Sequence, residues 1–192
     1  IQKMDQHLCQ SYYAINYLKE NKINNTSYLS DYISDEYLNI NENWKDKKNI
    51  IAYNPKKGKE FTEKIINKSP HLTFIPIQNL TTDQVKELLL KSKVYIDFGN
   101  HPGKDRIPRE AATCGCCIIT NQQGSAKFKE DVPINKEFKF EDNEENIRVI
   151  IDKITQCIKN YDIEIKKFKE YRNFIKTEKK QFKLDVKRIF GK

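Results

Sequence analysis

The sequence contains no long apolar run, and none of its stretches approaches the roughly 20 apolar residues that a membrane-spanning helix needs. It also lacks a signal peptide, and its first residue is Ile1 rather than a methionine. A chain of 192 residues is long enough for one well-buried domain with an appendage, but too short for two full-sized domains. We therefore expect a soluble, cytoplasmic piece of a larger protein, with a single core.

Cysteine pairs at metal-ligand spacing are also missing. The chain has five cysteines, an odd number, whereas a zinc site favours Cys-x-x-Cys pairs with further ligands nearby. Three of them, Cys114, Cys116 and Cys117, crowd a segment that runs into Ile118 and Ile119, as at a helix-to-strand junction in a core. We expect reduced, buried thiols and neither a bound metal nor a cofactor.

The net charge of +8 is concentrated at one end of the chain. From Tyr161 to Lys192 there are 11 Lys and Arg against 5 Asp and Glu, so this tail supplies +6 of the total. The rest of the chain is nearly neutral, and outside the tail its basic residues are not interleaved with aromatics. This pattern argues against nucleic-acid binding and favours contact between the basic tail and a partner protein or an anionic membrane surface.

Four short runs rich in branched and aromatic residues alternate with helical patterns, which predicts right-handed βαβ units. The fold class is therefore α/β, a Rossmann-like parallel sheet flanked by helices, with extra C-terminal helices. The predicted strands are Asn49 to Tyr53, Leu72 to Ile77, Val94 to Phe98 and Cys117 to Thr120. We divide the chain into a segment connecting from a preceding domain (1–48), the sheet domain (49–160) and a basic helix (161–192).

Capping signals mark several helices. Thr81 and Gln84 form a capping-box pair at the start of one helix. Pro108 suits the first position of a short helix that Gly115 ends in a left-handed conformation, which puts Glu110 in the first turn. Further helices are predicted for Ser11 to Glu20, Lys59 to Asn67, Asn143 to Lys159 and the basic tail. The Asn-rich passage from 21 to 48 carries no clear element.

Three loops follow predicted strands and should meet at one edge of the sheet. In the first, Lys56, Lys57 and Gly58 lie beside a helix N-terminus, which suits either a phosphate site or an ordinary solvated turn. The amide side chains of the third loop, residues 121–126, can hold hydroxyls or a base edge, but the composition equally describes an ordinary turn, which we rank first.

The second loop carries more chemistry, because Gly99 and Gly103 permit close backbone approach among residues of both charge signs. Glu110 can accept two hydrogen bonds from a sugar diol, and Arg106 or Arg109 can pair with phosphate. His101 is either a general base, a hydrogen-bond donor to a sugar hydroxyl, or structural. The alternative for the whole loop is an ion pair of Asp105 or Glu110 with an arginine that only orders it.

Taken together, these segments resemble the donor-binding, carboxyl-terminal half of a GT-B-fold glycosyltransferase of the type that builds bacterial surface polysaccharides. The resemblance runs from about Lys48 to Lys159. In that family a Lys-Gly after the first strand contacts the donor diphosphate, here Lys57-Gly58. A glutamate in the stretch Pro-x-x-x-Glu-Ala-x-Ala-x-Gly-x-Pro-Val-Ile binds the donor ribose, here Glu110. This chain departs from the pattern in two ways. Pro108 stands only two residues before Glu110, and the position of the family's earlier glutamate is occupied by Pro102.

The resemblance implies a hexosyltransferase that uses a nucleotide-sugar donor and a glycan or lipid-linked glycan acceptor in polysaccharide synthesis, without a metal. It implies that an N-terminal acceptor domain is missing, because residues 7–18 resemble the last strand and helix of that domain. It also implies that this fragment is inactive alone. The predicted donor-binding residues are Lys57, Gly58, Gly103, Arg106, Arg109 and Glu110, and the catalytic candidates are His101, Arg106 and Glu110.

A peripheral site at the inner membrane face is the expected location if the basic tail binds lipid. The alternative function is a non-catalytic α/β module that recruits a partner or an anionic membrane through that tail. It predicts vesicle or partner binding that depends on Lys179, Lys180, Lys183 and Lys187, without nucleotide-sugar binding.

Overall fold

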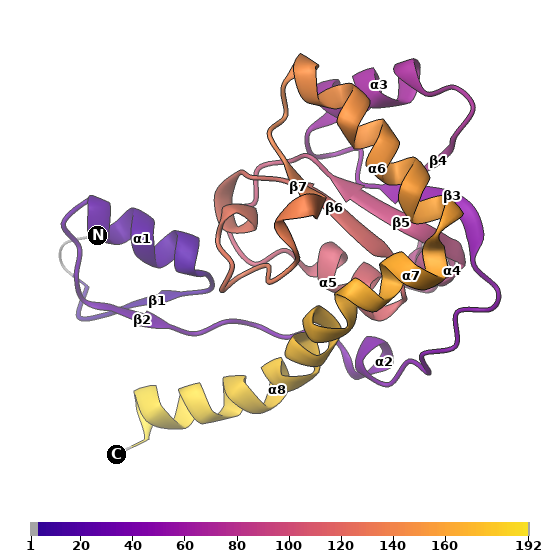
Figure 1. Ribbon diagram of the computed structural model, residues 1–192. Helices are drawn as coiled ribbons and strands as arrows, with labels where there is room; N and C mark the ends of the chain where they lie inside the picture. The colour runs from indigo at the N-terminus through magenta and orange to yellow at the C-terminus, as the bar shows by residue number, and fades with distance from the viewer. Residues whose placement is uncertain (1–3, 192) are drawn as a thin grey trace.

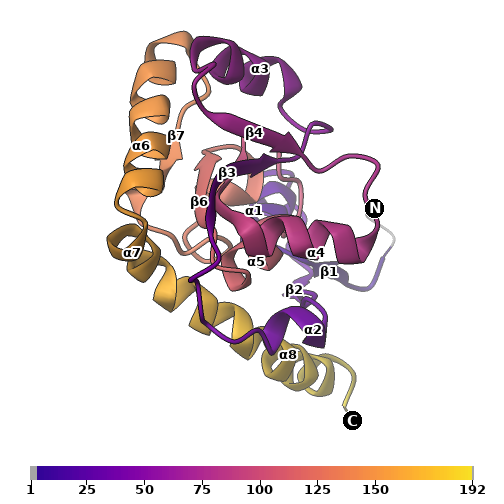
Figure 2. The ribbon, with the colours of Figure 1, turned by 90° about the vertical axis from the view of Figure 1, so that its right-hand side faces the viewer.

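A computed structural model describes residues 4–191 of the chain. Its centre is a five-stranded, fully parallel sheet in the order β4-β3-β5-β6-β7. The strands are β3 (Lys48–Tyr53), β4 (Thr73–Pro76), β5 (Ser92–Asp97), β6 (Cys117–Asn121) and β7 (Lys139–Phe140). Helices α3 (Lys59–Lys68) and α6 (Ile147–Lys159) cover one face, and α4 (Thr82–Lys91) and α5 (Arg106–Thr113) cover the other (Figures 1 and 2). The predicted Rossmann-like sheet is confirmed.

Several short elements among the described residues were missed, including two strands and one helix. The strand β7 has only two residues. Within the passage from 21 to 48 the structure forms β2 (Thr26–Tyr28) and the single-turn helix α2 (Asp35–Leu38). β2 pairs in parallel with β1 (His7–Cys9), about twenty residues earlier in the chain. Such short segments are too brief for a periodic hydrophobic pattern, so the sequence gives little sign of them.

The local capping signals are largely confirmed. Ser11 caps α1 (Tyr12–Glu20), and the Thr81–Gln84 capping box at the start of α4 makes both of its hydrogen bonds. Gly115 follows α5 with a left-handed φ of 83°. The predicted start of α5 was wrong, because the helix begins at Arg106 with extended Asp105 as its N-cap residue. Glu110 therefore lies in the second helical turn.

The core lies on both faces of the central strands. β5 and β6 are buried along nearly their whole length, as expected for parallel strands with helices on both sides. Helix α6 contributes an apolar stripe that includes Ile147, Ile150, Ile154 and Cys157. All five cysteines are free and buried, as the sequence predicted for buried thiols.

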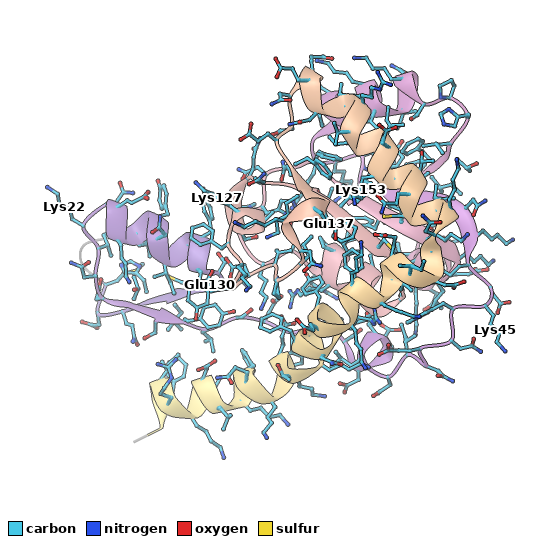
Figure 3. All side chains as sticks on the ribbon, viewed as in Figure 1. Lys22, Lys45, Lys127, Glu130, Glu137 and Lys153 are labelled. Carbon is cyan, nitrogen blue, oxygen red and sulfur yellow. The ribbon has the colours of Figure 1, made fainter. Side chains whose placement is uncertain are left out.

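The first and last described segments pack against the sheet domain from outside. In Figure 1 the β1–α1–β2 unit stands beside the sheet, and α8 (Lys169–Phe190) runs away from α7 (Tyr161–Glu164) beneath it. Asp131 accepts hydrogen bonds from the backbone amides of Tyr12 and Tyr13 at 2.9 and 3.1 Å. Figure 3 shows Glu137 beside Lys153 of α6, with 2.7 Å between their charged atoms. The division at residues 48 and 160 stays a prediction.

Over residues 4–191, none of the helices combines the length and the apolar character needed to cross a bilayer.

Candidate functional site

The order of the strands creates a topological switch point between β3 and β5, which we call the crevice. The chain passes from β3 to β4 on one side and then crosses back to place β5 on the other side of β3. The loops that leave two such strands turn to opposite faces of the sheet, and ligands bind where they diverge, at the carboxyl ends of the strands. At this point lie the loops 54–58 and 98–105, which are the first two loops predicted from sequence.

Glycine lets the three loops approach one another closely. Gly58 has a φ of 57°, and a Cβ atom there would lie 2.1 Å from the carbonyl oxygen of Phe98. Gly124 has a φ of 56°, and a Cβ atom there would lie 2.1 Å from the carbonyl oxygen of His101. No other residue type fits either position without moving backbone. The sequence prediction that the loops meet is therefore correct in its geometry.

The third loop braces the second. Asn121 donates a side-chain hydrogen bond to the carbonyl of Gly99 at 3.0 Å, and Ser125 donates its amide to the carbonyl of His101 at 2.8 Å. The Ser125 hydroxyl also donates to the carbonyl of Gly103 at 2.7 Å. Gly103 itself has no left-handed φ, so its contribution is this carbonyl rather than backbone freedom.

A chain of polar side chains runs from the sheet to the surface at the crevice. The ammonium of Lys57 contacts the Oδ2 atom of Asp105, which is also 2.5 Å from Nδ1 of His101. The other imidazole nitrogen, Nε2, lies 3.5 Å from Oδ1 of Asp97. Asp97 in turn accepts hydrogen bonds from the hydroxyl of Tyr95 at 2.9 Å and from the amide of Gly99 at 3.1 Å.

The two carboxylates of this chain have opposite pKa shifts. Burial raises the pKa of Asp97, against the opposing effects of His101 and its hydrogen-bond donors. Burial also acts to raise the pKa of Asp105, but hydrogen bonds from His101 and Lys57 outweigh it and lower the pKa overall. Asp105 is therefore ionised at neutral pH and carries the negative charge that holds Lys57.

The same side chains are the place where the described residues could hold a metal. Asp97, His101 and Asp105 offer ligand atoms that all lie within 4.8 Å of one another. A divalent cation there would compete with the Lys57 ammonium for Asp105. The metal-free chemistry predicted from sequence stays a prediction.

Glu110 lies on the same helix as Asp105 and is nearly buried, with its side chain 8% exposed. Arg106, on the previous turn and 59% exposed, donates to its Oε1 atom at 3.2 Å. Burial raises the pKa of Glu110, and the charge of Arg106 opposes that shift. Five residues of helix separate Asp105 from Glu110, or about 7.5 Å along the axis.

Arg109 points away from the crevice and is 1% exposed. All five of its N–H groups make hydrogen bonds within the protein. Its guanidinium pairs with Glu178 of α8 at 2.9 Å and with Asp31 at 2.6 Å. The remaining bonds go to the carbonyls of Asp31, Lys104 and Asp105.

The structure thus leaves Arg109 no N–H for a donor phosphate, and its place is that of a clamp between α5, α8 and the segment before α2. Sequence analysis missed its ion pair with Glu178 and the pair of Lys104 with Glu178 at 2.6 Å. The partners lie about seventy residues apart in the chain, so no local pattern connects them.

Hollows lie on both sides of the second loop. One, of about 520 Å³, is lined by Gly58, Phe61, Phe98 and Asp142, among others. The second, of about 480 Å³, lies between α8, the start of α1 and the end of β2, and Lys104 is part of its wall. Both volumes fall in the range of small-molecule sites in proteins.

The fold of the described residues is similar to that of about half of several glycosyltransferases of the GT-B fold. No protein-family profile matches the sequence, and no curated protein does. Among solved structures, Staphylococcus aureus TarM in complex with UDP superimposes with a TM-score of 0.73 at 16% identity, covering 100% of this chain and 45% of TarM. Anabaena HepE in complex with UDP-glucose gives a TM-score of 0.69 at 9% identity, covering 96% of this chain and 63% of HepE.

The pneumococcal O-GlcNAc transferase GtfA, in complex with UDP and GlcNAc, gives a TM-score of 0.63 at 12% identity over 100% of this chain and 46% of GtfA. At these identities the comparisons establish the fold. The chain spans about half the length of TarM and GtfA.

Proposed function

We propose that this chain is the donor-binding half of a hexosyltransferase and that its crevice between β3 and β5 binds the nucleotide-sugar donor. The observation that carries the proposal is the meeting of Lys57 with the N-terminus of α5 at the switch point of the sheet, with Glu110 on the same helix. A cation and a helix N-terminus attract a diphosphate, and a carboxylate accepts both hydroxyls of a ribose. TarM, HepE and GtfA hold UDP or UDP-glucose, which supports a ligand of this class.

Each residue has a defined role in this proposal. Lys57 pairs with the diphosphate, and Gly58 allows the first loop to reach the second. Gly103 keeps the loop braced through its carbonyl, and Glu110 receives the ribose. Arg106, the exposed cation of the first turn of α5, adds positive charge near the diphosphate. Arg109 has a structural role instead.

Such a site supplies the chemistry of the leaving group. When the glycosidic bond of the donor breaks, negative charge builds on the departing diphosphate, and fixed cations stabilise it. The side chains of Lys57 and Arg106 supply this positive charge, so the proposal needs no metal ion. His101 is not exposed to act as a general base, since its side chain is 3% exposed and faces Asp97 and Asp105.

The acceptor glycan would enter from the side of β1 and β2, which we interpret as the end of an N-terminal acceptor domain. Because a closed cleft needs both domains to exclude water, we expect this chain to bind donor and to transfer little. Polysaccharide synthesis at the inner membrane face is the corresponding setting. Contact between α8 and an anionic membrane surface stays a prediction.

Calorimetric titration of the chain with UDP, GDP and dTDP tests the proposal. We expect at least one of the three to bind, and Lys57→Ala and Glu110→Gln to weaken that binding by about 10-fold or more, since each removes a charged contact worth at least about 1.4 kcal/mol. Lys56→Ala is the matched control, because it removes the neighbouring lysine of the same turn.

Equal binding by wild type, Lys57→Ala and Glu110→Gln would refute the assignment of the donor site. Absence of binding by all three nucleotides would refute the proposed function of this chain.

A further inference from the structure

A single carboxylate oxygen connects the exposed and the buried parts of the crevice. Oδ2 of Asp105 contacts both the ammonium of Lys57 and Nδ1 of His101. The exposed fraction of the side chains decreases from the surface inward, from 30% for Lys57 through 22% for Asp105 to 3% for His101. Asp105 does not cap α5 with its side chain, so this carboxylate is free to contact both Lys57 and His101.

The ammonium of Lys57 needs a contact that holds it in place, because its flexible side chain extends from a turn that is fixed only at its backbone. The turn that carries it is fixed at its backbone, where the amides of Lys56 and Lys57 donate to Asn54. The four-carbon side chain beyond Cβ is flexible, and holding it in one conformation costs entropy. A Cβ atom on Gly99 would lie 2.3 Å from the Cβ of Lys57, so glycine leaves room for the base of this side chain. This contact does not reach the ammonium.

The inner half of the chain is rigid. His101 is buried between two carboxylates, with Nδ1 at Asp105 and Nε2 facing Asp97. Asp97 is held by the Tyr95 hydroxyl and the Gly99 amide, both on the central strand β5 or directly after it. The third loop fixes the backbone of His101 through Ser125. The position of the Asp105 carboxylate is therefore set from the core of the sheet.

We propose that Asp105 and His101 are positioning residues for Lys57, a role that rests on the proposed function of this crevice. Asp105 holds the ammonium at the N-terminus of α5 before the donor arrives, and His101 fixes the carboxylate that does so. The diphosphate then binds a lysine whose side chain is already ordered, so less side-chain entropy is lost on binding. Neither residue touches the donor.

A double-mutant cycle, with UDP as the probe and calorimetry as the measurement, tests this role. We expect Asp105→Asn to weaken UDP binding by about 3- to 10-fold, a smaller loss than that of Lys57→Ala. In the Lys57→Ala background the same change should cause no loss, or should tighten binding, because a carboxylate without its lysine only repels the diphosphate. A residue that merely stabilised the loop would weaken binding equally in both backgrounds.

Two variants of His101 separate its nitrogen atoms. The amide of His101→Asn places a donor near the position of Nδ1, whereas the longer amide of His101→Gln reaches toward the position of Nε2. We expect His101→Asn to retain most of the UDP affinity and His101→Gln to lose about as much as Asp105→Asn. Thermal unfolding of each variant confirms that it is folded before titration.

The outcomes distinguish the two proposals. If UDP binds but Lys57→Ala leaves that binding unchanged, the part assigned to Lys57 in the donor site fails, and the positioning role falls with it. If none of UDP, GDP and dTDP binds, the proposed function itself fails. If Lys57→Ala weakens binding but Asp105→Asn leaves or tightens it in the wild-type background, or costs the same factor in both backgrounds, the positioning role alone is overturned. Equal affinity of His101→Asn and His101→Gln overturns the part assigned to His101.

Discussion

Arg109→Met is expected to lower the free energy of unfolding by about 3–5 kcal/mol, the cost of removing one partner from a buried ion pair. The substitution leaves Glu178 buried with only Lys104 as its partner and removes the partner of Asp31. It also strips the hydrogen bonds from the carbonyls of Lys104 and Asp105, which shape the loop before α5. A loss of this size is a large fraction of the stability of an ordinary domain.

Urea denaturation of the chain, followed by circular dichroism, measures the change. Arg106→Met is the matched control, because it removes an arginine from the same helix at a position 59% exposed. We expect the control to change the free energy of unfolding by about 1 kcal/mol or less. Similar stability for Arg109→Met and Arg106→Met would show that Arg109 is not the clamp that its contacts indicate.

Gly58→Ala is expected to destabilise the chain by about 2–5 kcal/mol and to weaken donor binding as well. One part of the cost is the left-handed φ of 57°, which disfavours any residue with a Cβ atom. The larger part is steric, because the new methyl group would lie 2.1 Å from the Phe98 carbonyl oxygen and 2.8 Å from the Gly99 amide nitrogen. The first two loops must then separate, which moves Lys57 away from Asp105.

Gly103→Ala provides the comparison for this prediction. Its nearest contact would be the side-chain oxygen of Gln10 at 3.2 Å, a flexible group that can move aside. Thermal unfolding should therefore show a large drop in midpoint for Gly58→Ala and a small one for Gly103→Ala. An unchanged midpoint and unchanged UDP affinity in Gly58→Ala would contradict the close approach of the loops.

The sheet and the convergence of its loops could be predicted from sequence because their signals are local. Apolar runs such as residues 94–98 mark buried strands, and the capping pair Thr81–Gln84 marks a helix start, without reference to the rest of the chain. Once the strands are parallel, their carboxyl ends share an edge. Gly58 and Gly124 then act as expected for glycine, since close backbone approach is what their position requires.

The environment of each charged side chain could not be predicted in this way. Lys57 in the first loop and Arg109 in α5 both looked like candidates for phosphate binding from sequence. In the structure Arg109 forms an ion pair with Glu178 of α8, whereas Lys57 pairs with Asp105 across the crevice. The sequence alternative of an ion pair between Glu110 and a nearby arginine is met by Arg106. The pairs of Arg109 with Asp31 and Glu178 were not expected, because these partners come from distant segments. The predicted start of α5 was two residues too late, because proline fits the third helical position, where Pro108 lies, as well as the first.

The most direct test of the account is a crystal structure of the chain with UDP. We predict electron density for the diphosphate between Lys57 and the N-terminus of α5, with the ribose hydroxyls within hydrogen-bond distance of the Glu110 carboxylate. UDP bound only elsewhere, for example in the hollow between Tyr28 and Phe174, would contradict it.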